Sequence, residues 1–430
     1  MSIERFVKRL ADLGRIVTGK TPPTIHQEYY GGEVPFVTPS DMDGRRWIGS
    51  TDRYLTSEGV DSVRTSLVPK GALMVSCIGS EMGKVAMAER GCVTNQQINS
   101  LIVEAGDNPI FVYYCLSRMK SEIRSVAGGS AVPILNKTGF GDLLIEVPQI
   151  PEQHAIANIL GTLDDKIELN RRMNETLEAM ARTLFKSWFV DFEPVRAKVE
   201  GRDTGLPKGI ADLFPDRLIE TEFVEIPEGW RLGKIGEIAD INKWTLGRWD
   251  DLDIIDYIEI SEVMRGEVGI ITRYARGEEP SRARRRLKHG DTALSTVRPD
   301  RGAYFLALNP IESLIASTGF AVLTPKDGNW AFLHILTTRT EFGHELGRLA
   351  DGGAYPAIRP EIIGNREILL PIDSRLIAAF DDIAQPILLR AEVNRKESRA
   401  IAAIRDTLLP NLLSGEISIE GVARIAEEVH

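Results

Sequence analysis

The chain has 430 residues, of which 62 are acidic and 52 are basic, so its net charge is -10 at pH 7. A hydrophobic fraction of 43% is ordinary for a globular protein and excludes wholesale disorder. No stretch approaches the roughly 20 apolar residues that span a bilayer, and the first ten residues lack the apolar run of a secretory signal. We therefore expect no membrane association and a cytoplasmic location. The acidic balance argues against bulk coating of nucleic acid but leaves room for local basic patches.

Residues 1–150 carry short apolar segments separated by Gly, Pro and Asp, a pattern typical of mixed strands, loops and short helices. Residues 14–21 fit the GxxxxGK[ST] pattern of a phosphate-binding loop. That chemistry needs a preceding strand and a helix that begins at the Lys-Thr pair. Here a helix-like segment precedes the pattern, and Pro22 and Pro23 follow it at once. We therefore reject a nucleotide site.

Residues 151–192 predict a long helix, because no proline follows Pro151 until after Trp188 and apolar residues recur with 4-3-4-3 spacing. This spacing is a heptad seam, which is typical of helices that pair in coiled coils. A helix of about 36 residues would be roughly 54 Å long. The positions that we expect to pair are Leu163, Ile167, Asn170, Leu177 and Leu184.

The rest of the chain follows the same order of parts. Residues 193–226 hold prolines and mixed charges and predict a connector, and residues 227–371 return to the mixed pattern of the first 150. Residues 372–430 predict a second long helix and a tail. Pro386 interrupts the seam of this helix, and we expect a bend or a restart there. The expected pairing positions are Ile387, Asn394, Ile401 and Leu408.

The second half repeats the first at an offset of 219 to 224 residues. Residues 9–16 match 231–238, the glycine pair at 128–129 matches that at 352–353, and Asn170 matches Asn394. Several matches in the same order indicate an internal duplication. We expect the two helices to pack antiparallel, with the two asparagines as a buried pair that fixes the register. The alternative is that each seam packs only on its own domain.

The arginines at residues 281–301, where seven basic side chains face only two acidic ones, are candidates for binding DNA phosphate. Such a run is usually a solvated face, but this chain is otherwise acidic. Polar loops at residues 94–97 and 135–137 are candidates for reading bases, since Asn and Gln pair bidentately with adenine. Amides that cap turns are an equally good interpretation. The full candidate set is Lys20, Arg45, Arg46, Gln96, Gln97, Asn136 and Lys137 in the first half and Arg284, Arg285, Arg286, Arg298 and Arg301 in the second.

No pattern in the chain indicates catalysis. The six histidines are scattered, and Cys77, Cys92 and Cys115 have neither zinc-finger nor CxxC spacing. The chain has no GxSxG elbow, no GxGxxG and no Asn- or Asp-Pro-Pro-aromatic tetrapeptide. We therefore predict no catalytic residue, no metal site and no cofactor in this chain, and buried thiols in a reducing compartment.

Several motifs taken together resemble the specificity subunits of type I restriction–modification systems. The first half carries Gly-Lys-Thr-Pro at 19–22, Tyr-Gly-Gly-Glu-Val-Pro-Phe at 30–36 and Asn-Gln-Gln-Ile-Asn at 95–99. The second half keeps Ile-Pro-Glu-Gly-Trp at 226–230 and Leu-Pro-Asn-Leu-Leu-Ser-Gly at 409–415. It departs from the first at Arg359-Pro360, where the first half has Leu135-Asn136.

The resemblance implies an α+β fold with two tandem-duplicated α/β target recognition domains, at 1–150 and 227–371, joined by two long antiparallel coiled-coil helices. It implies a non-catalytic reader of a bipartite, asymmetric site in double-stranded DNA. The helices would set the spacing of the half-sites and dock two modification (methyltransferase) subunits, and restriction (motor-nuclease) subunits would join them. S-adenosylmethionine, ATP and Mg²⁺ would act in those partners.

Two alternatives remain at this point. The duplicated domains can be a protein-binding scaffold that the paired helices bridge, which a gel shift with the modification subunit would distinguish. A stand-alone methyltransferase is disfavoured by the missing tetrapeptide.

Overall fold

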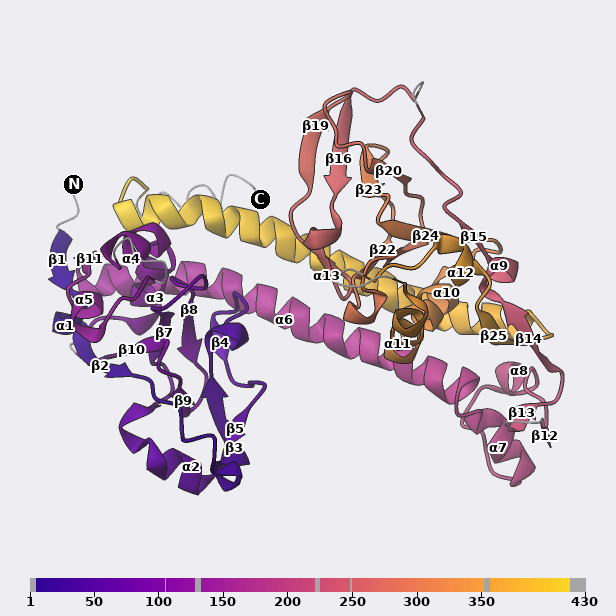
Figure 1. The fold of residues 1–430 in the computed structure, drawn as a ribbon, viewed down its shortest axis with the longest axis horizontal. Coiled ribbons are helices and arrows are strands. Elements are labelled where there is room, and N and C mark those ends of the chain that lie inside the picture. The colour runs from indigo at the N-terminus through magenta and orange to yellow at the C-terminus, as the bar shows by residue number, and fades with distance from the viewer. Residues whose placement is uncertain are drawn as a thin grey trace. The chain divides into compact units, whose positions relative to one another are not determined.

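The computed structural model describes residues 5–104, 106–127, 133–220, 225–247, 250–351 and 356–417 (Figure 1). It divides into a first unit, residues 1–170 with 397–430, and a second unit, residues 171–396, and each is described by itself. The glycine pairs at 128–129 and 352–353 lie outside the described residues. Within the described part of the chain, no helix is long and apolar enough to cross a membrane.

The first unit contains two mixed sheets. In the larger sheet, β2 (Gly14–Thr18), β10 (Ile98–Val103), β7 (Leu73–Ser76) and β8 (Val85–Ala88) are antiparallel neighbours, and β4 (Trp47–Ile48) lies parallel to β8. The smaller sheet has the order β5 (Tyr54–Leu55), β3 (Tyr30–Val37), β9 (Cys92–Thr94) and β6 (Leu67–Val68). A separate pair joins β1 (Arg5–Arg9) to β11 (Leu144–Pro148). The helices are α1 (Leu10–Leu13), α2 (Ser57–Ser62), α3 (Pro109–Ser117), α4 (Lys120–Val126) and α5 (Lys137–Gly141).

Helix α3 lies in the core of the first unit, and all residues from Phe111 to Leu116 are buried. The Asn108 side chain starts this helix by accepting the backbone N–H groups of Ile110 and Phe111. The fully buried Gln153, in the first turn of α6 (Ile150–Phe189), accepts the backbone N–H of Asn108 at 2.9 Å. This bond fixes the start of the long helix to the domain that precedes it.

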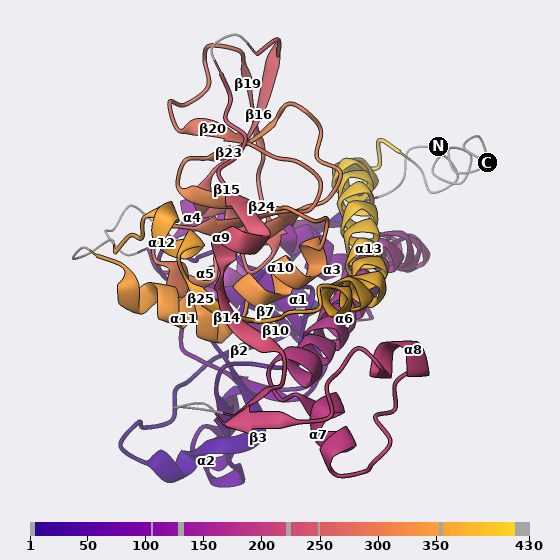
Figure 2. The same ribbon diagram turned by 90° about the vertical axis from the view of Figure 1, so that its right-hand side faces the viewer.

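The second unit has the same order of parts. Strands β15 (Ala239–Ile241), β24 (Phe320–Pro325), β21 (Asp291–Ser295) and β22 (Tyr304–Ala307) are antiparallel neighbours. A second sheet has the order β19 (Thr272–Ala275), β16 (Ile254–Ile258), β23 (Leu314–Ser317) and β20 (Ala283–Arg286), and Figure 2 shows it within this unit. Two further pairs are β14 (Trp230–Lys234) with β25 (Glu367–Pro371) and β17 (Val263–Met264) with β18 (Glu267–Val268). The helices are α9 (Ile235–Ile238), α10 (Trp330–Thr337), α11 (Thr340–Leu349) and α12 (Pro360–Gly364).

The two units confirm the predicted duplication. The β1–β11 pair corresponds to β14–β25, with antiparallel register in both. The order β2-β10-β7-β8 corresponds to β15-β24-β21-β22, again with the same strand directions. Helices α1 and α9 follow equivalent strands and begin with the same backbone capping arrangement.

The two long helices, α6 and α13 (Arg375–Ser414), pack together antiparallel, as the sequence predicted (Figure 1). In the first unit, the Asn170 side-chain amide donates to Ser398 Oγ at 3.3 Å. In the second unit, the Asn394 amide donates to Asn174 Oδ1 at 2.9 Å. Four residues forward along α6, from Asn170 to Asn174, therefore correspond to four residues backward along α13, from Ser398 to Asn394. This is the register of an antiparallel pair.

The prediction that Asn170 pairs with Asn394 is wrong, because each asparagine has a different partner. Antiparallel packing of duplicated helices brings each residue opposite the repeat equivalent of a different residue. Asn170 therefore lies opposite Ser398, which is the repeat equivalent of Asn174. Asn394, the equivalent of Asn170, pairs with Asn174 itself. Asn170, Asn174 and Asn394 are all buried, so a polar layer sits in the seam.

The ends of both helices also pack on the domain cores, as the alternative interpretation held. Trp188 and Phe380 are buried in the core of the second unit, with their ring centroids 6.0 Å apart. Ile156 and Leu412 are buried in the core of the first unit. The predicted pairing residues other than the asparagines are half-buried: Leu163, Ile167, Leu177, Leu184, Ile387, Ile401 and Leu408.

The expected restart at Pro386 is wrong, because α13 is a single helix of 40 residues. A proline removes one backbone hydrogen bond from a helix. The residues on either side of Pro386 hold the helix to the core of the second unit, since Phe380, Ala384 and Leu388 are all buried. Tertiary packing thus outweighs the local cost.

Residues 193–226, expected to be a connector, contain regular elements. They are α7 (Glu193–Val199), α8 (Lys208–Ala211), β12 (Leu218–Glu220) and β13 (Glu225–Pro227). Val195 and Phe214 are buried in the core of the second unit. Pro194 lies in the first turn of α7, where a missing N–H costs nothing.

Candidate nucleic-acid interface

Three loops of the first unit meet at one end of its larger sheet. The Lys20 backbone N–H, just after β2, donates to the Thr94 carbonyl at 2.8 Å. The Cys77 N–H donates to the Gln97 carbonyl at 2.7 Å, and the Cys77 carbonyl accepts the Leu135 N–H at 2.9 Å. These bonds bring together the loops that carry Lys20, Gln96 and Gln97, and Asn136 and Lys137, and we name this group the first loop cluster.

The polar side chains of the first loop cluster are available to different degrees. Lys20, Gln96, Asn136 and Lys137 are exposed, and Gln97 is half-buried. The Asn136 Oδ1 accepts the Gly139 N–H at 2.8 Å and so caps α5. The capping interpretation of this amide is therefore correct, although its N–H₂ group is not used in the cap.

The GxxxxGKT pattern has a different structural basis from a phosphate loop. Its first five residues form β2, and the next helical turn begins only at Gln27. A Cβ at Gly19 would lie 1.9 Å from the Asn95 carbonyl oxygen, so only glycine permits the close approach of these two backbone segments. The close approach fixes Lys20 beside the loop that carries Gln96.

Arg45 and Arg46 lie outside the first loop cluster. Arg45 forms an ion pair with Asp43 at 2.7 Å. Arg46 is only 8% exposed, and its guanidinium donates to the Tyr114 hydroxyl at 3.1 Å and forms an ion pair with Asp165 on α6. Because this guanidinium is buried and neutralised, the assignment of Arg46 to a DNA surface is corrected to a structural role.

Arg46 belongs to a buried network that joins the domain to both helices. The Tyr114 hydroxyl donates to Asp164 on α6 at 2.6 Å, and Arg405 on α13 forms an ion pair with the same carboxylate at 2.6 Å. Burial and the Asp164 charge raise the pKa of Tyr114. Burial lowers the pKa of Arg405, but hydrogen bonds and charges from Asp164 and Asp406 outweigh it and raise that pKa above its usual value. Both shifts keep the Tyr114 hydroxyl protonated and the Arg405 guanidinium charged at neutral pH.

The second unit repeats the backbone framework of the first loop cluster. The Thr296 N–H donates to the Gly319 carbonyl at 2.8 Å, and the Ile358 N–H donates to the Thr296 carbonyl at 2.8 Å. These two bonds are the counterparts of the two made by Cys77. The loops that carry Arg298, Thr318 and Arg359 therefore form a second loop cluster on an equivalent scaffold.

Arg298 is the one residue of the second loop cluster that the sequence singled out. Arg359 was missed as a candidate and was noted only as a departure from the first half, where it was set against Leu135. The structure makes Arg359 the equivalent of Asn136, since both residues start the equivalent helices. Its signal lies in the equivalence of the loops. The backbone bonds define that equivalence even where the two sequences have diverged.

Three of the other predicted basic residues, Arg284, Arg285 and Arg286, lie on β20 and are half-buried. Arg286 forms an ion pair with Asp250 at 3.1 Å, and Arg284 lies 3.4 Å from Glu279. Burial lowers the pKa of Arg285. The Thr318 N–H donates to the Arg282 carbonyl at 2.8 Å, which attaches this strand to the second loop cluster.

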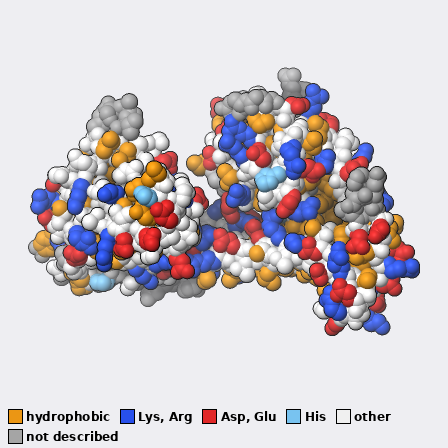
Figure 3. All heavy atoms as spheres, turned by 60° about the horizontal axis from the view of Figure 1, so that its bottom comes forward, with side chains coloured by type: hydrophobic (Ala, Val, Ile, Leu, Met, Phe, Trp, Pro, Cys, Tyr) orange, Lys and Arg blue, Asp and Glu red, His pale blue; other side chains and the backbone are white. Residues whose placement is uncertain are grey.

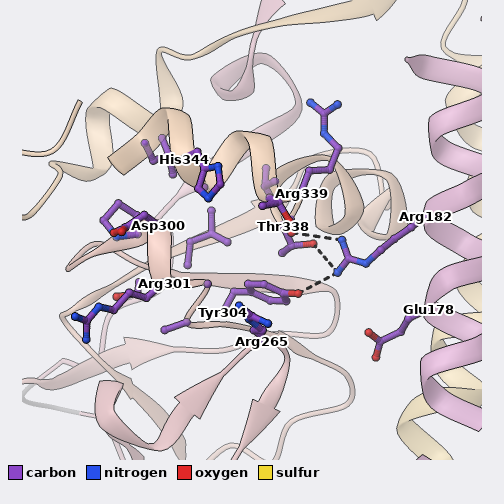
Figure 4. A pocket seen from close by; sticks show the side chains of 18 residues that line it. Glu178, Arg182, Arg265, Asp300, Arg301, Tyr304, Thr338, Arg339 and His344 are labelled. Carbon is purple, nitrogen blue, oxygen red and sulfur yellow. Dashed lines mark hydrogen bonds between the residues drawn. The ribbon is translucent and has the colours of Figure 1, made fainter. Parts of the chain in front are cut away.

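Arg301 is one of the residues that line a polar cavity of about 430 Å³ in the second unit (Figure 4). Arg182 reaches from α6 towards the same cavity and donates to the Tyr304 hydroxyl at 3.0 Å. Arg265 adds a positive group to the lining, His344 adds an imidazole, and Glu178 and Asp300 add negative groups. Arg298 and Arg301 are thus at opposite ends of the short turn Pro299–Arg301, and only Arg301 lines the cavity.

Basic and acidic side chains are interspersed on the face of the molecule drawn in Figure 3. Within the described residues, no group of three or more His, Cys, Asp or Glu side chains is placed to hold a metal ion. The three cysteines are free and buried, and burial raises the pKa of the Cys77 thiol to about 11. None of these groups suggests chemistry outside the two loop clusters.

The fold and the loop clusters define a tandem-duplicated protein with two equivalent polar surfaces and a shared antiparallel helix pair. Comparison with known proteins identifies relatives of this kind. Residues 4–179 match the family of the type I restriction modification DNA specificity domain. Over nearly its whole length the chain is similar to specificity subunits of type I restriction–modification systems, the family that its motifs resemble.

Individual relatives cover the whole chain or one half of it. The type I restriction enzyme MjaIX specificity subunit of Methanocaldococcus jannaschii is 26% identical over 96% of this chain and 94% of its own length. The HindI specificity subunit of Haemophilus influenzae is 33% identical over 39% of this chain and 38% of its own. The crystal structure of an S subunit from M. genitalium has the same fold, with a TM-score of 0.56 at 14% identity and 96% coverage of both chains.

Proposed function

We propose that this chain is the non-catalytic subunit that reads a bipartite, asymmetric sequence in double-stranded DNA for a type I restriction–modification complex. The observation that carries the proposal is the repeated backbone framework of the two loop clusters with different side chains on each. A shared framework presents side chains in the same geometry. Different side chains in that geometry read different base sequences.

The proposal assigns a part of the task to each segment. Residues 1–150 and 227–371 are the two target recognition domains. Residues 151–192 and 372–430 carry the helices that set the spacing of the two half-sites, and residues 193–226 connect the halves. Lys20, Gln96, Gln97, Asn136 and Lys137 contact the first half-site, while Arg298 and the neighbouring arginines of β20 serve the second.

Exposed apolar side chains on the helices support the docking of two modification subunits. In the first unit, Leu169 of α6 is 55% exposed and Ile404 of α13 is 52% exposed. In the second unit, Val393 of α13 is 53% exposed and Met180 of α6 is 54% exposed. Leu169 and Val393 are repeat equivalents, as are Met180 and Ile404. Each unit therefore presents one copy of the same apolar pair, which suits two copies of one partner.

The partners supply the chemistry in this proposal. The modification subunits bind S-adenosylmethionine and methylate the target adenine. The restriction subunits join for cleavage and use ATP and Mg²⁺. The assembly acts in the cytoplasm, and this chain contributes only the choice of site.

A binding experiment tests the DNA proposal against the scaffold alternative. The chain is mixed with its modification subunits and labelled duplex DNA from the methylated motif of the host genome, in a gel shift. A specific shift that competing DNA of altered sequence fails to remove supports the reader. Binding that is equal for all sequences, or absent, would contradict it and favour the scaffold.

The docking proposal has a separate test. Replacing Leu169 and Ile404 with Glu should remove one modification subunit, and replacing Val393 and Met180 with Glu should remove the other. Native mass spectrometry should show a change from two partner subunits to one in either case. Retention of both subunits by both variants would refute this surface.

A further inference from the structure

The duplication allows each position of the second unit to be compared with a built-in reference, its equivalent in the first. Backbone positions with positive φ are informative, because residues with side chains rarely adopt this conformation. Three such positions are glycine in both units. They are Gly71 and Gly290 (φ 85° and 86°), Gly83 and Gly302 (89° and 73°), and Gly106 and Gly328 (82° and 74°).

A fourth position has glycine in the first unit but arginine in the second. Gly79 has φ 81° and its N–H donates to the Pro133 carbonyl at 3.1 Å. Its equivalent, Arg298, makes the same bond to Pro356 at 2.8 Å but has φ 46°. An arginine thus occupies a left-handed position where the sister domain uses glycine. Strained residues that a fold retains are concentrated at functional sites.

The space around this position is open. A Cβ added to Gly79 would meet no heavy atom within 4 Å. Glycine is therefore required there by its backbone angle and not by crowding. A long side chain at the equivalent Arg298 is accommodated and remains half-buried.

A second arginine of the same cluster also replaces a locally favourable residue. Asn136 caps α5 by accepting the Gly139 N–H at 2.8 Å, whereas Arg359, at the equivalent start of α12, makes no side-chain cap. Arginine has no acceptor for this purpose, and a positive charge is disfavoured at a helix start. Arg359 is exposed, so burial in the core does not explain its presence.

The two arginines lie on loops that one isolated bridge joins. Val297 and Ala357 form this antiparallel bridge. Arg298 directly follows Val297 and Arg359 lies two residues beyond Ala357, so the antiparallel direction places them on opposite sides of the bridge. Two locally unfavourable arginines thus replace two locally favourable residues within the second loop cluster.

We propose that Arg298 and Arg359 are DNA-contacting residues of the second target recognition domain. This inference rests on the proposed function and names the chemistry of that surface. A guanidinium fork takes two acceptors in one plane, which DNA offers either as the O6 and N7 of guanine or as two oxygens of a phosphate. The first loop cluster carries Gly79 and the Asn136 amide at the corresponding positions, so the two half-sites are recognised by different chemistry.

The test restores the residues of the first domain. R298G and R359N are prepared in the full chain and assembled with the modification subunits. Because R298G relieves an unfavourable angle, it should not lower the Tm of the protein, yet DNA affinity should fall at least about fivefold. N309G is the matched control, since Asn309 also has positive φ (49°) but lies outside the second loop cluster. It should leave affinity unchanged.

Methylation sequencing of cells that express each variant identifies the contact. Relaxation at one base pair of the second half-site indicates guanine, and uniformly weaker methylation with an unchanged motif indicates phosphate. Wild-type affinity in both variants, or relaxation of the first half-site, would overturn the inference. If the wild-type complex itself shows no sequence-specific binding, the proposed function fails instead.

Discussion

Asp291 gives a quantitative prediction about the second unit. It is the first residue of β21 and is fully buried, and its carboxylate accepts the Lys288 N–H at 2.7 Å. Burial raises the pKa of Asp291 from 3.8 to about 6, against the opposing effects of the Lys288 backbone and of nearby positive charge. The folded protein therefore holds this proton more tightly than the unfolded chain does.

The raised pKa fixes the sign of the pH dependence. The protonated carboxyl favours the fold, so its contribution is full below pH 3.8 and is lost as the pH rises through about 6. A shift of about two units corresponds to about 3 kcal/mol at pH 7. About 2 kcal/mol of this loss falls between roughly pH 4.5 and 7.5.

The substitution Asp291→Asn removes the titration and keeps an oxygen acceptor for Lys288. Urea unfolding of both proteins at pH 4.5 and 7.5 measures the free energy of unfolding of each. The difference between variant and wild type should increase by about 2 kcal/mol in favour of the variant at the higher pH. Any constant effect of the amide cancels in this comparison. Parallel pH profiles for the two proteins would refute the reasoning.

Further substitutions test the packing of the first unit and of the helix pair. Arg46→Met should lower the free energy of unfolding of the first unit by about 1–3 kcal/mol, because it removes the bond of a buried guanidinium to the Tyr114 hydroxyl and its ion pair with Asp165; an unchanged free energy of unfolding in urea melts would contradict the network. Asn394→Leu alone should destabilise by about 1–3 kcal/mol, because it strands the Asn174 amide, whereas the double change to Leu should recover that loss. Additive effects of the two changes would contradict the direct pair. Gly19→Ala should prevent folding of the first unit, and native circular dichroism and amide protection in that variant would show that the close approach is not required.

The sequence predicted the duplication and the helix pair because both depend on periodic or repeated patterns. The 4-3-4-3 spacing of apolar residues is visible without a structure. The asparagine partners were wrong, because the choice between equivalents depends on the three-dimensional register of two antiparallel helices. The predicted restart at Pro386 was wrong, because the effect of a proline on a helix was judged from the local sequence alone. Packing of the buried side chains on either side of Pro386 cannot be judged in that way.

The candidate site was predictable only where polar residues lay in recognisable loops. Lys20, Gln96 and Asn136 meet in the first loop cluster. Arg46 looked equally suitable, but its partner carboxylates lie more than 100 residues away on α6. Arg359 was noted only as a departure from the first half and not as a candidate, because no local pattern marks a missing helix cap as significant. Comparison of two folded copies of one domain reveals it.

Exchange of residues 1–150 for those of another specificity subunit tests the central claim most directly. The chimera is expressed with its modification subunits in a host that lacks other methylation, and the methylated motif is read by sequencing. If the two target recognition domains read their half-sites independently, one half of the methylated motif changes while the other half and the spacer stay the same. Simultaneous change of both halves, or no change in either, would contradict the account.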